Sequence, residues 1–280
     1  MPDIQFAFSR LGHIYSCNLS NPNTYEAPNV HNPYFSTSDV NQMFTKATTN
    51  FSVFHSLVKI FYKLQGFVSM LNKAPSCFAV SETWSNSESA VGTIQLQNYT
   101  FIHKPSSTRA DGVGVYIQIC SNYSVCHDIC MPSSNCESLW VKIETNSGKF
   151  IYLGVIYRHP NQHFDDFKKD LNGVLTNFNL NNNEYIITGD LNIDLLESTS
   201  DNKVGRYDQN LESLGCKPLN TAPTRFSSTV SPSLLDHIYC KLRNTKQIAG
   251  IAIFDVSDHL PISLWLSTSI NRKSEKQIIR

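Results

Sequence analysis

The stretch Glu184-Tyr-Ile-Ile-Thr-Gly-Asp-Leu-Asn-Ile-Asp194 joins an apolar, strand-like run to a short acidic motif that begins at Gly189. A second apolar run, residues 250–256, leads in the same way into Ser257-Asp-His259. Ligands of layered α/β proteins are bound at the carboxyl ends of strands, so both motifs are candidates for chemistry. Together they supply carboxylates for a hard metal ion, an amide donor and a proton acceptor, which is the equipment of a metal-assisted hydrolase.

The composition bounds the class of protein. The chain has 280 residues, of which 41% are hydrophobic, enough for a substantial core in one large α/β domain or two small ones. Lys+Arg and Asp+Glu balance at 23 each, for a net charge of zero. This balance weighs against indiscriminate coating of nucleic acid, but it does not exclude a nuclease, because acidic metal ligands offset a local basic rim.

The cysteines and the N-terminus indicate the compartment. No basic start followed by an apolar run marks a signal peptide, and no stretch approaches the length of a membrane span. We therefore expect a nuclear or cytoplasmic protein that is not secreted, with its eight cysteines reduced and no membrane partner. Cys120, Cys126, Cys130 and Cys136 cluster, but paired C-x-x-C elements are missing, so their spacing matches no zinc pattern and we expect reduced thiols in an insertion.

Three regions are expected along the chain. Residues 1–50 are rich in Asn, Ser, Thr and Pro and lack sustained periodicity, which predicts a poorly ordered leader with at most a short helix near residues 40–44. Residues 51–268 are expected to form the folded domain. Residues 269–280 are polar and basic and are expected to be a tail or a truncated linker.

Within the domain, strand-like and helix-like runs are interspersed. Apolar residues at i, i+3, i+4 and i+7 from Leu57 to Leu71 predict an amphipathic helix, and further helices are expected at 165–178 and 207–214. Strands are expected at 51–55, 77–82, 112–120, 139–143, 150–157, 184–190, 234–241, 248–256 and 260–266. This mixture predicts an α/β fold, a four-layer α/β sandwich of two mixed β-sheets flanked by helices.

Polar side chains recur where the predicted strands end. Glu82, Tyr157, Asp190 and Asp258 all occupy such positions, although for any one of them a surface carboxylate or an ordinary turn is the simpler interpretation. Asp190 and Asn192 are two residues apart, so in extended backbone their side chains point the same way.

A further carboxylate, Asp236, lies inside the apolar run 234–238. A buried Asp is costly without a partner, and His259 is the obvious candidate, because an Asp–His pair fixes the histidine tautomer. We expect Glu82 and Asp258 to hold Mg²⁺ or Mn²⁺ through oxygen. Asp190 and His259 would then activate water, while Asn192, Tyr157 and His259 stabilise the transition state.

Six motifs in order make the chain resemble a known family. It is similar to the endonuclease/exonuclease/phosphatase superfamily, and more narrowly to the apurinic-type endonuclease domain of non-LTR retrotransposons. The motifs are Ser81-Glu-Thr-Trp, Tyr157-Arg-His-Pro-Asn, Gly189-Asp-Leu-Asn-Ile-Asp, Pro223-Thr-Arg, Leu235-Asp-His-Ile and Ser257-Asp-His. The resemblance implies a four-layer sandwich that uses Mg²⁺ to nick double-stranded DNA and so prime reverse transcription, and we expect a monomer.

The resemblance also implies a role for each matching residue. Glu82 matches the metal-binding glutamate, and Tyr157 matches the tyrosine that contacts phosphate. Asp190 and Asn192 match the residues that activate water and stabilise the transition state. Asp236 matches the residue that orients the catalytic histidine, and Asp258 and His259 match the final catalytic pair. Thr224 matches a position near the scissile strand, and Arg225 matches a phosphate contact.

One departure from the family keeps three readings open. The family places Asn at the end of the first strand, where it helps to hold the metal, and this chain has Leu57 there. Leucine offers no oxygen ligand, so either the remaining carboxylates hold the metal more weakly or this copy is a catalytically dead remnant. A phosphatase of the same superfamily, acting on a phospholipid or a nucleotide, is the third reading, because fold does not settle substrate.

Overall fold

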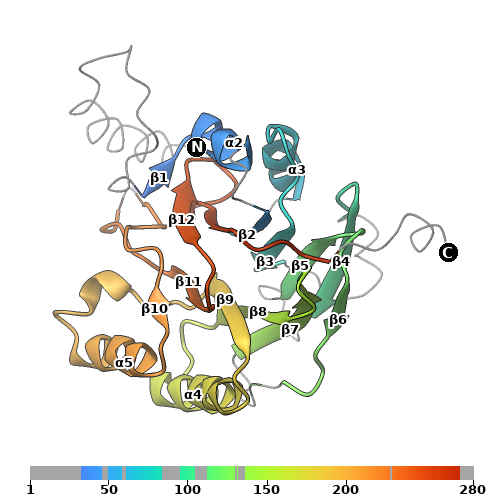
Figure 1. Cartoon of the computed structure of the whole chain (residues 1–280). Coiled ribbons are helices and arrows are strands. Elements are labelled where there is room, and N and C mark those ends of the chain that lie inside the picture. Colours follow the sequence, from blue (N-terminus) through green and yellow to red (C-terminus); the bar gives the residue numbers. More distant parts are fainter. Residues whose placement is uncertain are drawn as a thin grey trace.

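Two β-sheets are packed face to face with helices on their outer surfaces in the computed structural model (Figure 1). The structure describes residues 33–45, 50–58, 61–83, 95–104, 112–129, 131, 136–227 and 229–271. The first sheet has seven strands in the order β1 (Tyr34–Phe35), β12 (Gln247–Ala252), β13 (Ile262–Leu266), β2 (Phe51–Leu57), β3 (Cys77–Ser81), β5 (Val113–Gln118) and β4 (Tyr99–Lys104).

The second sheet has six strands and carries Asp190 and Asp236. Its order is β10 (Lys217–Pro218), β11 (Asp236–Lys241), β9 (Glu184–Asp190), β8 (Phe150–Arg158), β7 (Cys136–Glu144) and β6 (Tyr123–Val125). Both sheets are mixed: β2 pairs with β3, and β8 with β9, in parallel, while their other neighbours are antiparallel. A parallel pair needs a long crossover, and helices α3 (Phe61–Ser69) and α4 (Phe164–Leu180) supply it.

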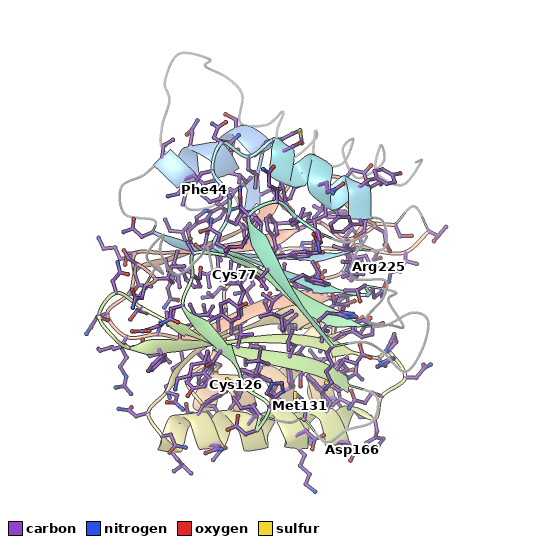
Figure 2. All side chains as sticks on the ribbon, turned by 90° about the vertical axis from the view of Figure 1, so that its right-hand side faces the viewer. Phe44, Cys77, Cys126, Met131, Asp166 and Arg225 are labelled. Carbon is purple, nitrogen blue, oxygen red and sulfur yellow. The ribbon has the colours of Figure 1, made fainter. Side chains whose placement is uncertain are left out.

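Three apolar clusters separate the four layers. One fills the space between the sheets and includes Val53, Val115, Leu153 and Ile186. A second packs α4 and α5 (Asn202–Ser213) on the second sheet, and a third packs α2 (Thr37–Thr45) and α3 on the first. Figure 2 shows these layers edge-on, with helices above and below the two sheets. The central strands β2 and β3 are buried on both faces, so every residue of each is buried and neither shows an alternation of buried and exposed positions. The predicted four-layer α/β sandwich is confirmed.

The expectation of a poorly ordered leader was wrong for residues 34–45, although the short helix expected near residues 40–44 is present within α2. β1 pairs in parallel with β12, and α2 buries Val40, Met43 and Phe44. The Phe44 ring stacks on Phe54 at a centroid distance of 6.1 Å. This segment is therefore part of the folded domain, although its polar composition hides the short buried face. Residues 1–32 and 46–49 of the expected leader and residues 272–280 of the expected tail lie outside the described residues.

Two other element predictions differ from the structure. Leu57 is the last residue of β2 and not the start of the following helix, which begins at Phe61. β12 ends at Ala252, so Asp258 lies in a loop and not at a strand end. Among the cysteines that the structure describes, Cys120, Cys126 and Cys136 are free thiols, and Cys130 lies outside that set. Within the described residues, no helix is long and apolar enough to cross a membrane.

Candidate active site

The two central carboxylates face each other across a strand pair. Asp190 ends β9 and Asp236 begins β11, and they are directly opposite partners in the antiparallel register. Both are buried, with 1% of each exposed. Gly189 precedes Asp190 with φ +151°, and a Cβ there would overlap the carbonyl oxygen of Ile156 on β8. The glycine of this motif is therefore required for β8 and β9 to approach closely.

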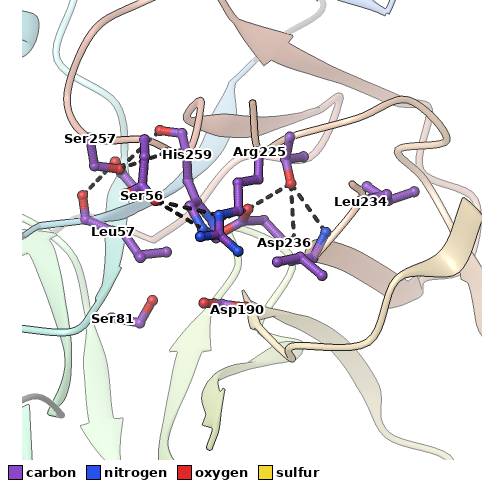
Figure 3. Close-up of polar contacts among 12 residues, drawn as sticks. Ser56, Leu57, Ser81, Asp190, Arg225, Leu234, Asp236, Ser257 and His259 are labelled. Atoms are coloured by element: carbon purple, nitrogen blue, oxygen red, sulfur yellow. Dashed lines mark hydrogen bonds and ion pairs between the residues drawn. The ribbon is translucent and has the colours of Figure 1, made fainter. Parts of the chain in front are cut away.

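The partner that the burial of Asp236 predicts is His259. His259 Nδ1 lies 2.8 Å from Asp236 Oδ2, and the hydroxyl of Thr224 donates to the same oxygen at 2.7 Å (Figure 3). His259 is brought to β11 by its loop, whose Leu260 N–H donates to the Thr224 carbonyl at 2.8 Å. Thr224 therefore positions both members of the pair, one through its side chain and the other through its backbone.

The charges of this group are strongly coupled. Burial alone would lower the pKa of His259, but Asp236, Asp190 and Asp258 outweigh it and raise this pKa to about 9. Burial would raise the pKa of Asp236, but the charge and hydrogen bond of His259 hold it below its usual value. Burial and the nearby Asp236 charge raise the pKa of Asp190 to about 7. At neutral pH His259 is thus a cation between two carboxyl groups, and Asp190 can exchange its proton readily.

Asn192 does not continue the strand as expected. Its φ is +48°, in the left-handed region, and its backbone N–H donates to Asp190 Oδ1 at 3.0 Å. Its side-chain Nδ2 donates to the Arg158 carbonyl at 2.7 Å. The extended backbone assumed for Asp190 and Asn192 was therefore wrong, because the chain turns directly after Asp190.

Arg158, which sequence reasoning left without a role, holds this turn. Its buried guanidinium donates from Nη1 to the carbonyls of Leu191 and Asn192 at 3.3 and 3.0 Å, and from Nη2 to Gln162 at 2.8 Å. The available signal was a charged residue inside the Tyr157-Arg-His-Pro-Asn motif, at the end of an apolar strand. Three carbonyl acceptors compensate much of the cost of burying this charge.

Glu82 and Tyr157 connect the two sheets. The Tyr157 hydroxyl at the end of β8 donates to Glu82 Oε1 at 3.3 Å, and Glu82 directly follows β3. Glu82 has φ +51°, an uncommon conformation for a residue with a side chain, so the surrounding structure must compensate a small strain. Its charge also acts on Asp190, since it contributes to the raised pKa of that carboxyl group.

Asp258 and Arg225 lie on the exposed side of His259. Asp258 Oδ2 is 4.0 Å from His259 Nε2 and 3.4 Å from Arg225 Nε. Arg225 forms isolated β-bridges with Ser233 and with His259, which anchors the loop around the histidine. The expected grouping is therefore present in two linked parts: Asp190, Asp236, His259 and Asp258 in one, and Glu82 with Tyr157 in the other.

The donors at this edge suit an oxygen-seeking divalent cation. Asp190, Asp236 and His259 are the one group of three possible ligands within 4.8 Å of one another among the residues that the structure describes. The Asp236–His259 hydrogen bond already uses one atom of each, so this group is a hydrogen-bonded pair beside a carboxylate and not a metal cage. Glu82 and Asp258, the carboxylates expected from the sequence to bind the metal, are not members of this group.

Leu57 occupies the position at which the resemblance leads us to expect an oxygen donor. It is 1% exposed, it is the register partner of Ser81, and its side chain points towards the His259–Asp236 pair in Figure 3. At the position of the missing oxygen ligand, this chain therefore has a buried apolar side chain, that of Leu57.

Comparisons with known proteins give the family context. Residues 62–259 match the model of the Endonuclease/Exonuclease/phosphatase family. No curated protein sequence matches the chain significantly. Among solved structures, the endonuclease domain of TRAS1, a telomere-specific non-LTR retrotransposon, is 15% identical with a TM-score of 0.59, covering 77% of this chain and 97% of that one.

Two further structures show how widely the fold is used. An AP endonuclease from Archaeoglobus fulgidus is 14% identical with a TM-score of 0.55, covering 76% of this chain and 98% of that one. The mannosyl-6-phosphatase Bt3783 from Bacteroides thetaiotaomicron is 12% identical with a TM-score of 0.55, covering 78% and 99%. At such identities the likeness concerns the fold alone, and it is shared by nucleases and a phosphatase.

Proposed function

Because this chain belongs to the endonuclease/exonuclease/phosphatase family, we propose that it is a metal-dependent phosphodiesterase that nicks double-stranded DNA, like the retrotransposon endonuclease domains it resembles. The observation that carries the proposal is the buried Asp236–His259 pair with Asp190 opposite Asp236. These groups provide a cation and a base for hydrolysis of a phosphate ester.

Asp190 is the base in this proposal, and His259 binds the phosphate. A pKa of about 9 keeps His259 protonated at neutral pH, so its Nε2–H donates to a phosphate oxygen while Nδ1–H is held by Asp236. Asp190, with a pKa of about 7, accepts the proton of the attacking water. The sequence alone assigned water activation to Asp190 and His259 together, and this proposal leaves Asp190 as the proton acceptor.

Mg²⁺, with Mn²⁺ as a substitute, would be held by Glu82 and Asp258. It would neutralise the phosphate and its leaving oxygen. The hydroxyl of Tyr157, which donates to Glu82, would contact the same phosphate. Thr224 supports Asp236, and the half-exposed Arg225 contacts the DNA backbone beside Asp258.

The burial of Leu57 favours a second candidate, a catalytically inactive member of the family. The side chain replaces a possible oxygen donor with an apolar group that is 1% exposed. With fewer ligands, the metal affinity falls, and below some affinity the site would not be filled at cellular Mg²⁺.

A plasmid-nicking assay separates these candidates. The purified chain is incubated with supercoiled plasmid and Mg²⁺, with EDTA as the control, and open-circular product is measured beside the Asp190→Asn variant. Mg²⁺-dependent nicking that Asp190→Asn removes supports the proposal. Release of phosphate from phosphomonoesters without nicking would favour a phosphatase, and neither activity from a folded chain would favour the inactive protein.

A further inference from the structure

A second buried histidine lies on the other side of Asp236. His55 is on β2, fully buried, and its Nδ1 is 3.7 Å from Asp236 Oδ1. Neither of these two atoms has a hydrogen-bond partner in the part of the chain that the structure describes. The other carboxylate oxygen, Oδ2, takes both His259 and Thr224. Asp236 thus has one fully used oxygen and one that faces His55.

The other ring nitrogen of His55 is occupied. His55 Nε2 lies 2.9 Å from the hydroxyl oxygen of Ser81, the last residue of β3. Burial lowers the pKa of His55 to about 4, so the ring is neutral at pH 7 and carries one N–H. Two tautomers are then available. If Ser81 donates to Nε2, the N–H is on Nδ1 and faces Asp236.

The Nδ1–H tautomer is the favourable one. In the other tautomer, the lone pair of Nδ1 would face an ionised carboxylate oxygen, and both buried groups would stay without a donor. Leaving a buried polar group unsatisfied is destabilising, and more so when the group is charged. A small approach of the ring and the carboxylate from 3.7 Å converts this contact into a hydrogen bond.

We propose that His55 is a positioning residue that fixes Asp236 from behind through Nδ1–H, with its tautomer set by the hydroxyl of Ser81. The resulting chain Ser81–His55–Asp236–His259 runs from the end of β3, next to Glu82, to the histidine that binds phosphate in the function proposed above, on which this role rests. Holding Oδ1 prevents the carboxylate from rotating, so Oδ2 stays aimed at His259 and Thr224.

The tautomer itself is the first test, and it does not require activity. Long-range ¹H–¹⁵N spectra of the full chain with ¹⁵N-labelled histidine, assigned with His55→Asn, report which nitrogen of His55 carries the proton. We expect Nδ1–H in the wild type and a shifted signal in Ser81→Ala. Ser263→Ala is the matched control, because Ser263 is also buried in the first sheet but donates to Gly250. An Nε2–H tautomer in the wild type would overturn the proposal.

The second test separates positioning from packing. His55→Leu fills the buried position with an apolar side chain and removes the N–H donor. His55→Asn keeps an N–H donor near the Nδ1 position. We expect His55→Leu to shift the Nδ1–H proton signal of His259 and to lower kcat for nicking by about 10–100-fold with little change in KM. His55→Asn should recover part of both. An unmoved His259 signal in a folded His55→Leu variant would overturn the role, and absent nicking with the expected spectra would count against the proposed function alone.

Discussion

The two sides of the candidate site consist of different groups, a hydrogen-bonded histidine side and a side with the expected metal ligand Glu82. On the histidine side, Asp236 Oδ2, His259 and Thr224 are joined by hydrogen bonds of 2.7 and 2.8 Å, and Asp190 is held by the turn after β9. On the metal side, the Tyr157 hydroxyl donates to Glu82 at 3.3 Å, and the neighbouring strand ends in the apolar Leu57. In the proposed function, Asp190 and His259 act on water and phosphate while Glu82 and Asp258 hold the metal, so proton transfer and metal binding can be weakened separately.

The largest effect is expected on the histidine side. His259→Ala removes the buried cation between Asp190 and Asp236, and with it the donor to phosphate, so nicking should fall by about 10²–10⁴-fold. The loss should persist at every Mg²⁺ concentration, which is measured by titrating Mg²⁺ in the plasmid assay. His163→Ala, at a histidine with a 72% exposed side chain, is the control. If high Mg²⁺ rescued His259→Ala, the separation of the two sides would be wrong.

The next effect is expected on the metal side. Leu57→Asn places an oxygen at the end of β2, so the Mg²⁺ concentration for half-maximal nicking should fall by about 10–100-fold, the usual scale for ligand and supporting interactions. Leu57→Met is the matched control, since it keeps an apolar side chain of similar volume. Urea denaturation checks that the buried amide has not unfolded the protein. An unchanged Mg²⁺ requirement would mean that the site is complete with leucine.

The sequence predicted the histidine side better than its surroundings, and the reason is the range of the interactions. A buried aspartate in the run 234–238 needs a polar partner, and this requirement pointed to His259 from the sequence alone. His55 and Arg158 were missed because their partners are distant in the sequence. Asp236, the partner of His55, is 181 positions away. The carbonyls of Leu191 and Asn192, which accept from Arg158, are 33 and 34 positions away. Arg158 at least carries a local signal, a charge at the end of an apolar strand, whereas no local pattern distinguishes His55 from an ordinary core residue.

Backbone geometry was the other limit. The motif containing Asp190 and Asn192 reads equally well as extended chain or turn, and the structure shows a turn with φ +48° at Asn192. Residues 34–45 were assigned to a leader because they carry little periodic signal. Only two residues pair with β12, and the short helix α2 buries only one face. The four-layer fold was predictable because long apolar strands and amphipathic helices carry that signal along most of the domain.

A stability effect should reveal the cost of the buried base. The folded-state pKa of Asp190 is about 7, above its ordinary value of 3.8. Between these values the folded protein keeps a proton that the unfolded chain releases, so this group lowers stability as pH rises from about 4 to about 7. Asp190→Asn should therefore raise the free energy of unfolding at pH 8 by about 1–4 kcal/mol, while nicking is lost.

This stability change is measured by urea denaturation in EDTA, at pH 5 and at pH 8, so that no metal compensates the charge. The gain should be larger at pH 8 than at pH 5. Asp165→Asn is the control, because Asp165 is on α4 with a 65% exposed side chain. An equal gain at both pH values would mean that Asp190 is not held protonated by its surroundings.

The smallest effect is expected at Arg225, on the exposed edge that joins the two sides. Its side chain is 45% exposed and its ion pair with Asp258 is 3.4 Å long, so the pair adds at most about 1 kcal/mol to stability. Arg225→Ala should raise KM for DNA a few-fold at low salt with kcat nearly unchanged, because a phosphate contact aids binding more than chemistry. The difference should shrink at high salt, where exposed charges are screened.

Arg243→Ala is the control, since Arg243 lies after β11, away from the site, and donates to the Asn182 carbonyl. A fall in kcat with unchanged KM would instead place Arg225 at the reacting phosphate, beside His259.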